Sequence, residues 1–169
     1  MGERPRSSRR VFDGAVLALD LEDWGQSYEH EVVRHPGAAG VLPVTGEGEV
    51  LLVRQLRPAI GQVLTEIPAG LLDVPGEDAL ACAARELFEE TGFRHTSIEF
   101  LGGYYSSPGF TDEYVHLFLA RTKAEADAEP EDGIALVREP FDRMVAAARG
   151  GRVRDVKTAL ALLLADGRG

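Results

Sequence analysis

The sequence has few features of a cross-linked, secreted or membrane-spanning protein. It contains a single cysteine, Cys82, so an internal disulfide is excluded, as are most zinc sites. No apolar run approaches the length that a bilayer-spanning helix needs. The first ten residues are basic and polar, and no apolar segment follows them as it would in a secretory leader. We therefore expect a cytoplasmic protein that does not enter membranes.

Positive charge is also scarce. The 169 residues include 18 Lys and Arg against 28 Asp and Glu, which gives a formal net charge of -10 at pH 7. Binding to nucleic acid needs a basic surface, so we expect no nucleic-acid partner. A hydrophobic content of 44% in a chain of this length suits one domain with a full core. We expect residues 1–10 to form a disordered basic arm and residues 11–169 to form a single domain.

Strand patterns dominate the chain, and helices are few. The order of strands, one helix, strands and two helices favours an α/β (α+β) fold, a mixed sandwich, over a doubly wound sheet. Turn residues such as Pro36-Gly37 separate the segments. The predicted strands lie within residues 11–24, 28–35, 38–44, 49–56, 61–70, 97–107, 113–121 and 134–140, and the predicted helices span residues 78–91, 141–151 and 155–166.

The first helix has clear end signals and an apolar stripe. Asp78 suits the N-cap and Gly92 suits the position after the last helical residue. Apolar residues recur at helical spacing, which predicts a stripe centred near Leu80 and Leu87 that faces the core.

Three carboxylates, Glu86, Glu89 and Glu90, lie beside that stripe. Like charges four residues apart destabilise an isolated helix by roughly 0.2–0.5 kcal/mol, and burial adds to the penalty. A hard divalent cation would neutralise them, because Mg²⁺ and Mn²⁺ prefer carboxylate oxygen. The alternative is a solvated acidic face screened by Arg85.

The spacing around these carboxylates resembles the Nudix box. That box consists of a Gly, five variable residues, a Glu, seven variable residues, and then Arg-Glu-apolar-x-Glu-Glu-x-Gly-apolar. Glu77 and the run "RELFEETGF", which begins at Arg85, match it completely. One departure lies upstream, where six residues rather than five separate Gly70 from Glu77. The extra residue falls in the loop "LLDVPG" and leaves the helical carboxylates in register.

The resemblance implies a Nudix-type α/β/α sandwich with a mixed β-sheet and an N-terminal antiparallel strand region. It implies hydrolysis of a nucleoside diphosphate linked to another group, with one to three Mg²⁺ or Mn²⁺ ions. Arg85 would hold the carboxylates in place together with Glu77. The residues that would hold metal are Ala69, through its carbonyl, and Glu86, Glu89 and Glu90, and the catalytic set would include Glu86, Glu89 and Arg85.

Segments outside the box resemble one subfamily, the ADP-ribose pyrophosphatases. Pro108, in "SSPGFTDE", lies sixteen residues after Gly92. The stretches "HEVVRHPGAAGVL", "LLVRQLRPAIGQVLTEIPAG" and "GGRVRDVKTALALLL" resemble the subfamily's early strands, the segment before the box and the C-terminal helix. The likeness runs from about Phe12 to Leu164.

The subfamily likeness suggests further site residues. Glu113 is the candidate general base or additional metal ligand, with Asp112 as its substitute, and the alternative is an exposed loop acid. Arginine suits phosphate or ribose hydroxyls through its fork of donors, and an aromatic ring can stack on a base. The candidate substrate contacts are Arg54, Arg57, Glu66, Gly70, Trp24, Tyr28 and Pro108.

The sequence therefore predicts hydrolysis of ADP-ribose to AMP and ribose 5-phosphate. Two alternatives stay open: cleavage of another nucleoside diphosphate sugar, FAD or a dinucleoside polyphosphate, and a non-catalytic module that senses ADP-ribose. The resemblance also implies a homodimer in which strands within residues 11–35 exchange between subunits and help to form the adenine pocket. Cys82, which lies among alanines, is interpreted as a packing residue rather than a nucleophile.

Overall fold

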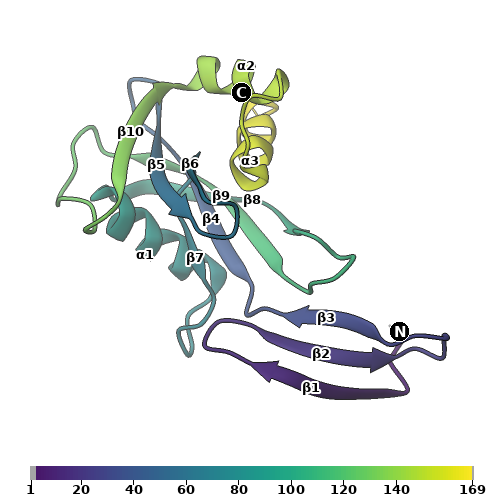
Figure 1. The fold of residues 1–169 in the computed structure, drawn as a ribbon. Coiled ribbons are helices and arrows are strands. Elements are labelled where there is room, and N and C mark those ends of the chain that lie inside the picture. The colour runs from purple at the N-terminus through teal and green to yellow at the C-terminus, as the bar shows by residue number, and fades with distance from the viewer. Residues whose placement is uncertain (1–2, 169) are drawn as a thin grey trace.

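The computed structural model describes residues 3–168, which form a central sheet, three helices and a separate small sheet (Figure 1). The strands are β1 Ser7–Asp13, β2 Ala18–Asp23, β3 His30–Arg34, β4 Ala38–Val44, β5 Glu49–Arg57, β6 Gln62–Glu66, β7 Ala69–Leu71, β8 His95–Tyr105, β9 Tyr114–Thr122 and β10 Ala135–Pro140, and the helices are α1 Ala79–Thr91, α2 Phe141–Arg149 and α3 Val156–Asp166.

The central sheet has seven strands in the order β10-β5-β4-β9-β8, with β6 paired to β5 and β7 paired to β4. The strands β4 and β9 run parallel, and the other paired strands run antiparallel. The sheet is therefore mixed, as the α/β (α+β) prediction requires. Ala38 pairs with Leu71 on one side and with Val115 on the other, so the end of β7 and the start of β9 lie at the same end of the sheet.

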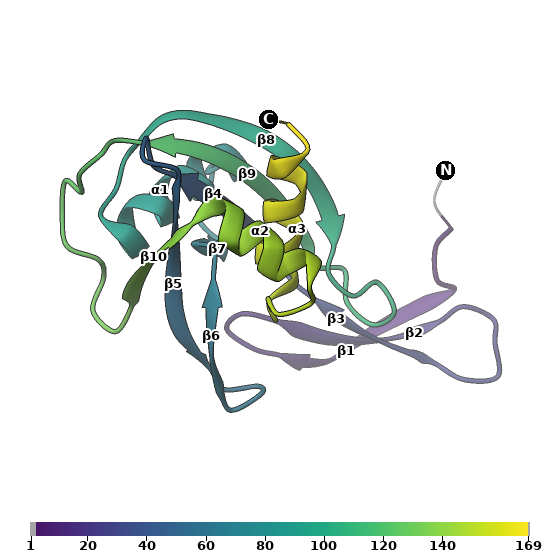
Figure 2. The ribbon, with the colours of Figure 1, turned by 90° about the horizontal axis from the view of Figure 1, so that it is seen from above.

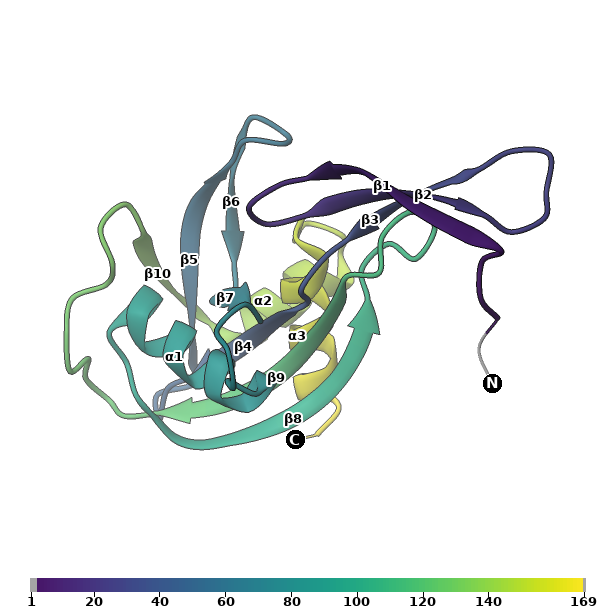
Figure 3. The same cartoon turned by 90° about the horizontal axis from the view of Figure 1, so that it is seen from below.

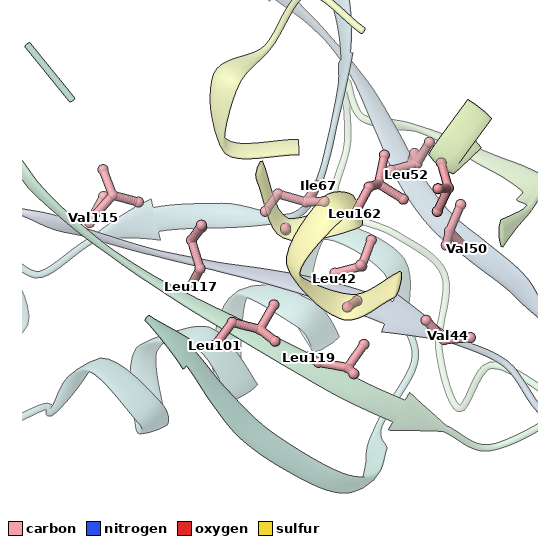
Figure 4. Packing of buried hydrophobic residues seen from close by; sticks show 14 residues of the cluster. Leu42, Val44, Val50, Leu52, Ile67, Leu101, Val115, Leu117, Leu119 and Leu162 are labelled. Carbon is pink, nitrogen blue, oxygen red and sulfur yellow. The ribbon is translucent and has the colours of Figure 1, made fainter. Parts of the chain in front are cut away.

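The helices cover the two faces of this sheet (Figures 2 and 3). Helix α1 packs on one face, where Ala83 and Leu87 meet Val41 and Leu51. Helices α2 and α3 pack on the other face, and Figure 4 shows Leu162 of α3 over the strand residues of that core. Each fully buried Leu or Val stabilises the fold by about 1.5–3 kcal/mol. The predicted α/β/α sandwich is therefore present, and it gives α1 a rigid support.

Helix α1 has the predicted ends but a different buried face. Asp78 accepts a hydrogen bond from the backbone N–H of Ala81, and Gly92 ends the helix at φ 75°, a conformation that favours glycine. Leu87 is fully buried as predicted, whereas Leu80 is 45% exposed, so the prediction fails at Leu80. The buried face is shifted toward Cys82 and Glu90. A carboxylate can lie there because a backbone N–H of β7 meets it.

The N-terminal strands β1, β2 and β3 form their own antiparallel sheet, which projects from the body (Figure 1). Strand β1 begins at Ser7, so the prediction of a disordered arm over residues 1–10 is wrong for residues 7–10. Ser7 pairs with Asp23, and Arg10 both pairs with Asp20 along the ladder and donates to its carboxylate at 2.7 Å. Residues 1 and 2 of the predicted arm lie outside the described residues.

Within residues 3–168, no helix is long and apolar enough to cross a bilayer.

Candidate active site

Arg85 joins three carboxylates at the exposed edge of α1. Its Nε and Nη2 donate to the two oxygens of Glu77 at 2.8 and 2.9 Å. Its Nη1 donates to Glu86 Oε1 at 2.6 Å and to Glu89 Oε2 at 2.8 Å. The hydrogen bond from Arg85 lowers the pKa of the Glu77 carboxyl, and the same contacts raise the pKa of Arg85. The structure thus brings together the four charged residues that the sequence grouped.

The Glu86 carboxylate lies directly against Gly70 of β7. A Cβ at position 70 would be 1.8 Å from Glu86 Oε1, so only glycine leaves room for this side chain. One turn further along α1, Glu90 Oε2 accepts a hydrogen bond from the backbone N–H of Ala69 at 3.1 Å. The helix and the strand β7 therefore meet through two carboxylates and two backbone positions. The residue inserted between Gly70 and Glu77 lies in the exposed turn that follows, away from this contact.

Burial makes these two carboxylates hard to ionise without a cation. Glu90 is only 6% exposed, and burial raises the pKa of its carboxyl to about 7. Burial likewise raises the pKa of Glu86, against the opposing effect of Arg85. Within residues 3–168, no lysine or arginine forms an ion pair with Glu90. A divalent cation would supply the missing positive charge, and these oxygen donors suit Mg²⁺ or Mn²⁺.

The carboxylates do not form a closed cage. In the described part of the chain, no group of three or more acidic, histidine or cysteine side chains is arranged to hold a metal ion alone. Mg²⁺ needs no such cage, because it is commonly held by one or two carboxylates, several waters and substrate phosphates. The residues present therefore fit an ion that is shared with a phosphorylated substrate. Glu86 and Glu90 are the first candidates, and Glu89 is joined to Glu86 through Arg85.

Arg57 and Glu66 form the second charged group of the site. Arg57 Nε and Nη2 each donate to Glu66 at 2.8 Å, and Glu66 is 1% exposed. Lys157 of α3 also donates to Glu66, at 3.1 Å, and to Asp155 at 2.7 Å. Because Arg57 uses its Nε and Nη2 for Glu66, its Nη1 donors do not bind this carboxylate. Lys157 and Asp155 were not predicted as site residues, and the only signal was a lysine at the start of an apolar helix.

Arg54 and Arg57 do not act as a pair. They lie three residues apart on β5, so their side chains leave opposite faces of the strand. Arg54 lines a separate cavity of about 590 Å³ between β5, β6, β10 and α2, together with Arg143 and Arg152. Arg54 and Arg57 therefore have different surroundings, and their role as substrate contacts stays a prediction.

The loop between β8 and β9 carries Glu113. Ser106 Oγ donates to Glu113 Oε2 at 2.5 Å, and His35 Nε2 lies 3.9 Å from the other oxygen. Because β7 and β9 pair with the same end of β4 from opposite sides, this loop lies at the same end of the sheet as Gly70. Asp112 instead accepts from Arg34 at 3.1 Å and from the His35 backbone N–H at 2.9 Å.

The same loop is paired to the N-terminal sheet. The Val33 N–H donates to the Phe110 carbonyl at 2.7 Å, and the Asp112 N–H donates to the Val33 carbonyl at 3.2 Å. Thr111 lies parallel to Val33 in an isolated bridge. The loop that carries Glu113 is thus attached to β3.

A cavity of about 520 Å³ opens between the N-terminal sheet and this loop. Trp24, Arg34 and Pro108 line it, which brings together two of the predicted substrate contacts. Trp24 is 37% exposed and its Nε1 donates to Glu22 at 2.9 Å. Tyr28 does not line the cavity, and its ring packs on His30 at a centroid distance of 4.8 Å.

Cys82 lies on the side of α1 that faces the hydrophobic core, and it is 0% exposed. Burial raises the pKa of its thiol to about 11, so the thiolate is scarce at neutral pH. The side chain donates to the Leu71 carbonyl at 3.4 Å. These contacts agree with packing and do not suit a nucleophile.

Comparison with known proteins identifies relatives of this chain. The family model described as "NUDIX domain" matches residues 34–158. An ADP-ribose pyrophosphatase of Bacillus subtilis (strain 168) is 34% identical, over 95% of this chain and 90% of that protein. A methanol dehydrogenase activator of Bacillus methanolicus is 35% identical with the same coverage. A GDP-mannose pyrophosphatase of Cronobacter sakazakii is 35% identical over 78% of each chain.

The fold also has a solved counterpart. The crystal structure of an ADP compounds hydrolase superposes with a TM-score of 0.76, covering 98% of this chain and 95% of that one, at 21% sequence identity. This likeness concerns the arrangement of helices and strands and agrees with the sandwich described above.

Proposed function

This chain belongs to the Nudix family and is a hydrolase of the Nudix type, and we propose that its substrate is ADP-ribose, which it cleaves to AMP and ribose 5-phosphate. One observation carries the proposal of a catalytic centre: Glu86 and Glu90 are buried against Gly70 and Ala69, while Arg85 holds the neighbouring acids. Such an arrangement suits a diphosphate whose charge is neutralised by divalent cations.

In this proposal the residues of α1 and β7 would hold Mg²⁺ or Mn²⁺, with Glu86, Glu90 and Glu89 and the Ala69 carbonyl as ligands. The chemistry that such an ion would supply is neutralisation of the diphosphate and a lower pKa for the attacking water. Arg85 keeps Glu86 and Glu89 oriented by the hydrogen bonds described above.

Glu113 accepts the proton of the attacking water. The oxygen of that water forms a new bond to phosphorus, the bond from phosphorus to the bridging oxygen breaks, and the bridging oxygen leaves with the other product. Ser106 donates a hydrogen bond to the Glu113 side chain just before β9. Asp112 is less suited to this role, because both its oxygens are engaged by Arg34 and the His35 backbone.

The remainder of the substrate would lie between Arg57 and the cavity of the N-terminal sheet. Arg57 offers its Nη1 donors to phosphate or ribose oxygens, and Glu66 orients its guanidinium. The half-exposed Trp24 ring offers a stacking surface for adenine, beside Pro108.

The relatives include pyrophosphatases named for two different substrates, ADP-ribose and GDP-mannose. Two ADP-ribose pyrophosphatases match 95% and 68% of this chain, and a GDP-mannose pyrophosphatase matches 78%. The match of the Bacillus subtilis protein over nearly the whole chain supports ADP-ribose, and GDP-mannose is the second candidate. FAD, dinucleoside polyphosphates and a purely ADP-ribose-sensing role are the remaining alternatives.

We further propose a homodimer in which the N-terminal sheets exchange between subunits. The sheet exposes a set of large apolar side chains that a second copy would cover. These are Val11, Phe12, Val16, Leu17, Trp24 and Tyr28. The predicted cytoplasmic location stays a prediction.

A product assay tests the proposed substrate. The protein is incubated with Mg²⁺ or Mn²⁺ and, in separate reactions, with ADP-ribose, GDP-mannose, FAD or a diadenosine polyphosphate, and the products are separated by anion-exchange chromatography. We expect the highest kcat/KM with ADP-ribose and equal amounts of AMP and ribose 5-phosphate. A higher kcat/KM for GDP-mannose would replace the proposal with the second candidate.

A further inference from the structure

The first turn of α3 is connected to the candidate active site by buried hydrogen bonds. Asp155 caps the helix, since its Oδ2 accepts from the Thr158 backbone N–H at 2.9 Å and from the Thr158 hydroxyl at 2.6 Å. The Thr158 hydroxyl in turn accepts from the backbone N–H of Ile67 at 2.8 Å. Thr158 and Ile67 are 0% and 1% exposed, so water cannot replace these bonds. The single hydroxyl proton is given to Asp155, which leaves an oxygen lone pair directed at Ile67.

Ile67 begins the short segment that holds the catalytic carboxylates. Its neighbour Pro68 accepts at its carbonyl from the Val41 N–H at 2.9 Å. The next residue, Ala69, donates to Glu90, and Gly70 lies beneath Glu86. Four successive backbone positions are therefore fixed, and α3 fixes the first of them. A shift of this segment would move the backbone N–H that Glu90 meets.

Lys157 connects the same turn to the candidate substrate arginine. Its ammonium bridges Asp155 Oδ1 and Glu66 Oε2, and Glu66 holds Arg57 in a bidentate pair. Two carboxylates and two cationic side chains thus form one chain of ion pairs, which is largely buried. Without the lysine, Glu66 and Asp155 would keep buried charges with one partner fewer, and Arg57 would lose part of its support.

We infer that Asp155, Lys157 and Thr158 are positioning residues for the hydrolase reaction: Thr158 sets the Ile67–Gly70 backbone against the metal-binding carboxylates, and Lys157 sets Arg57 through Glu66. The inference rests on the proposed function. None of the three residues contacts the reacting atoms in this account, and each acts through another residue. The two connections can be tested separately, because the one through Thr158 leads to the metal ligands and the one through Lys157 leads to a substrate contact.

The test uses the full-length protein with Thr158→Val, Thr158→Ser and Lys157→Met. Mn²⁺ affinity is measured without substrate from the electron paramagnetic resonance signal of free Mn²⁺, and kcat, KM and Tm are measured in parallel. We expect Thr158→Val to weaken Mn²⁺ binding about tenfold, the usual effect of removing a partner that orients a metal ligand. Thr158→Ser keeps the hydroxyl and should restore wild-type affinity. Lys157→Met should raise KM about tenfold and leave Mn²⁺ affinity unchanged.

A matched control separates positioning from general stability. Val145→Ala removes buried side-chain volume from α2 in the same core and leaves the hydrogen bonds of Asp155, Lys157 and Thr158 in place. It should lower Tm while Mn²⁺ affinity and KM stay at wild-type values. If Thr158→Val fails to fold, Thr158→Ala replaces it, because alanine also removes the hydroxyl that accepts from Ile67, and it should weaken Mn²⁺ binding in the same way. Asp155→Asn tests the other connection, because asparagine still caps the helix but loses the charge that holds Lys157; it should raise KM as Lys157→Met does.

The outcomes are distinct. Variants that lower Tm but leave Mn²⁺ affinity and KM unchanged in an active enzyme would overturn the positioning role alone. A wild-type protein that binds no Mn²⁺ and hydrolyses none of the four substrates would overturn the proposed function on which it rests.

Discussion

Glu86 and Gly70 are in direct contact: the Glu86 carboxylate occupies the space that any side chain at position 70 would fill. The hypothetical Cβ would lie 1.8 Å from Glu86 Oε1 and 2.1 Å from its Cδ. Gly70 has no positive φ, so the glycine is required by this close approach and not by the backbone conformation.

Gly70→Ala should displace Glu86 without unfolding the protein. The clash is with the far end of a flexible side chain, which can rotate away from β7. Because Glu86 would then leave the proposed metal site, we expect kcat to fall about 10- to 100-fold, measured with saturating Mn²⁺ and ADP-ribose. Gly46→Ala is the control, because an added Cβ meets no atom within 4 Å there, and it should leave kcat unchanged. Full activity of Gly70→Ala would contradict the role of Glu86.

Glu90→Gln should abolish turnover while the fold survives. The glutamine carbonyl can still accept from the Ala69 N–H, but it supplies no charge to a cation. A neutral amide is also easier to bury than a carboxylate, so the Tm should be retained or raised. We expect kcat to fall by about 100-fold or more, measured by release of AMP. Near-wild-type turnover with Mg²⁺ would count against the assignment of Glu90 as a ligand.

Arg85→Lys should disrupt the acidic cluster although it keeps the positive charge. An ammonium cannot reproduce the planar fork that serves Glu77, Glu86 and Glu89 together. The side chain is partly exposed, so we expect a loss of only about 1 kcal/mol in unfolding free energy, measured by urea titration, with a larger fall in kcat. Arg143→Lys is the matched control, because Arg143 of α2 forms an exposed ion pair with Glu139 of β10. Equal effects of the two variants on kcat would contradict the prediction.

Acid should destabilise the attachment of α3. The pKa values of Glu66 and Asp155 lie below their ordinary values of 4.5 and 3.8, because Arg57, Lys157 and Thr158 outweigh the opposing effect of burial. Between the lowered and the ordinary pKa values, the folded state therefore binds fewer protons than the unfolded state. The two carboxylates contribute fully to the unfolding free energy above their ordinary pKa values. This contribution is lost as the pH falls through the lowered pKa values.

Urea unfolding between pH 6 and pH 3 measures this effect. The unfolding free energy should decrease steadily below about pH 4.5 in the wild type. The Asp155→Asn variant should show a shallower decrease, since it lacks one of the two carboxyls. An identical pH dependence in both proteins would show that Asp155 does not contribute.

Phe12→Asp should separate the proposed dimer. Phe12 is 55% exposed on the N-terminal sheet, where a charge is harmless to a monomer but disfavours a covered apolar interface. Light scattering coupled to size-exclusion chromatography should give the mass of two chains for the wild type and of one chain for the variant. Val74→Asp, at a residue 46% exposed in the loop before α1, should leave the mass unchanged. A monomeric wild type would refute the dimer.

Local patterns predicted most of the fold. The ends of α1 were predictable because Asp78 and Gly92 satisfy backbone groups within one turn of the helix. Strand β1 was missed at residues 7–10, because "SSRR" is polar and exposed on both faces and therefore shows no alternation. What orders it is pairing with β2, including the contact of Arg10 with Asp20, and no local pattern shows such pairing.

The grouping of the candidate site residues was predictable where they lie on one helix or just before it. Glu77, Arg85 and the three glutamates of α1 follow from spacing, whereas Lys157 meets Glu66 across 91 residues of chain. Arg54 and Arg57 were both named from the subfamily likeness, which does not show that their side chains leave opposite faces of β5. Long-range contacts of this kind depend on how α3 packs.

The parallel bridge between Val33 and Thr111 makes the position of Glu113 depend on the N-terminal strands. Backbone bonds on both sides of Thr111 attach the loop to β3, and the Arg34–Asp112 ion pair reinforces them. A truncated protein that starts after residue 35 would keep every residue of the helix α1 but would lose the anchor of its candidate base. Rotation or swapping of the N-terminal sheet would likewise be transmitted to the reaction centre.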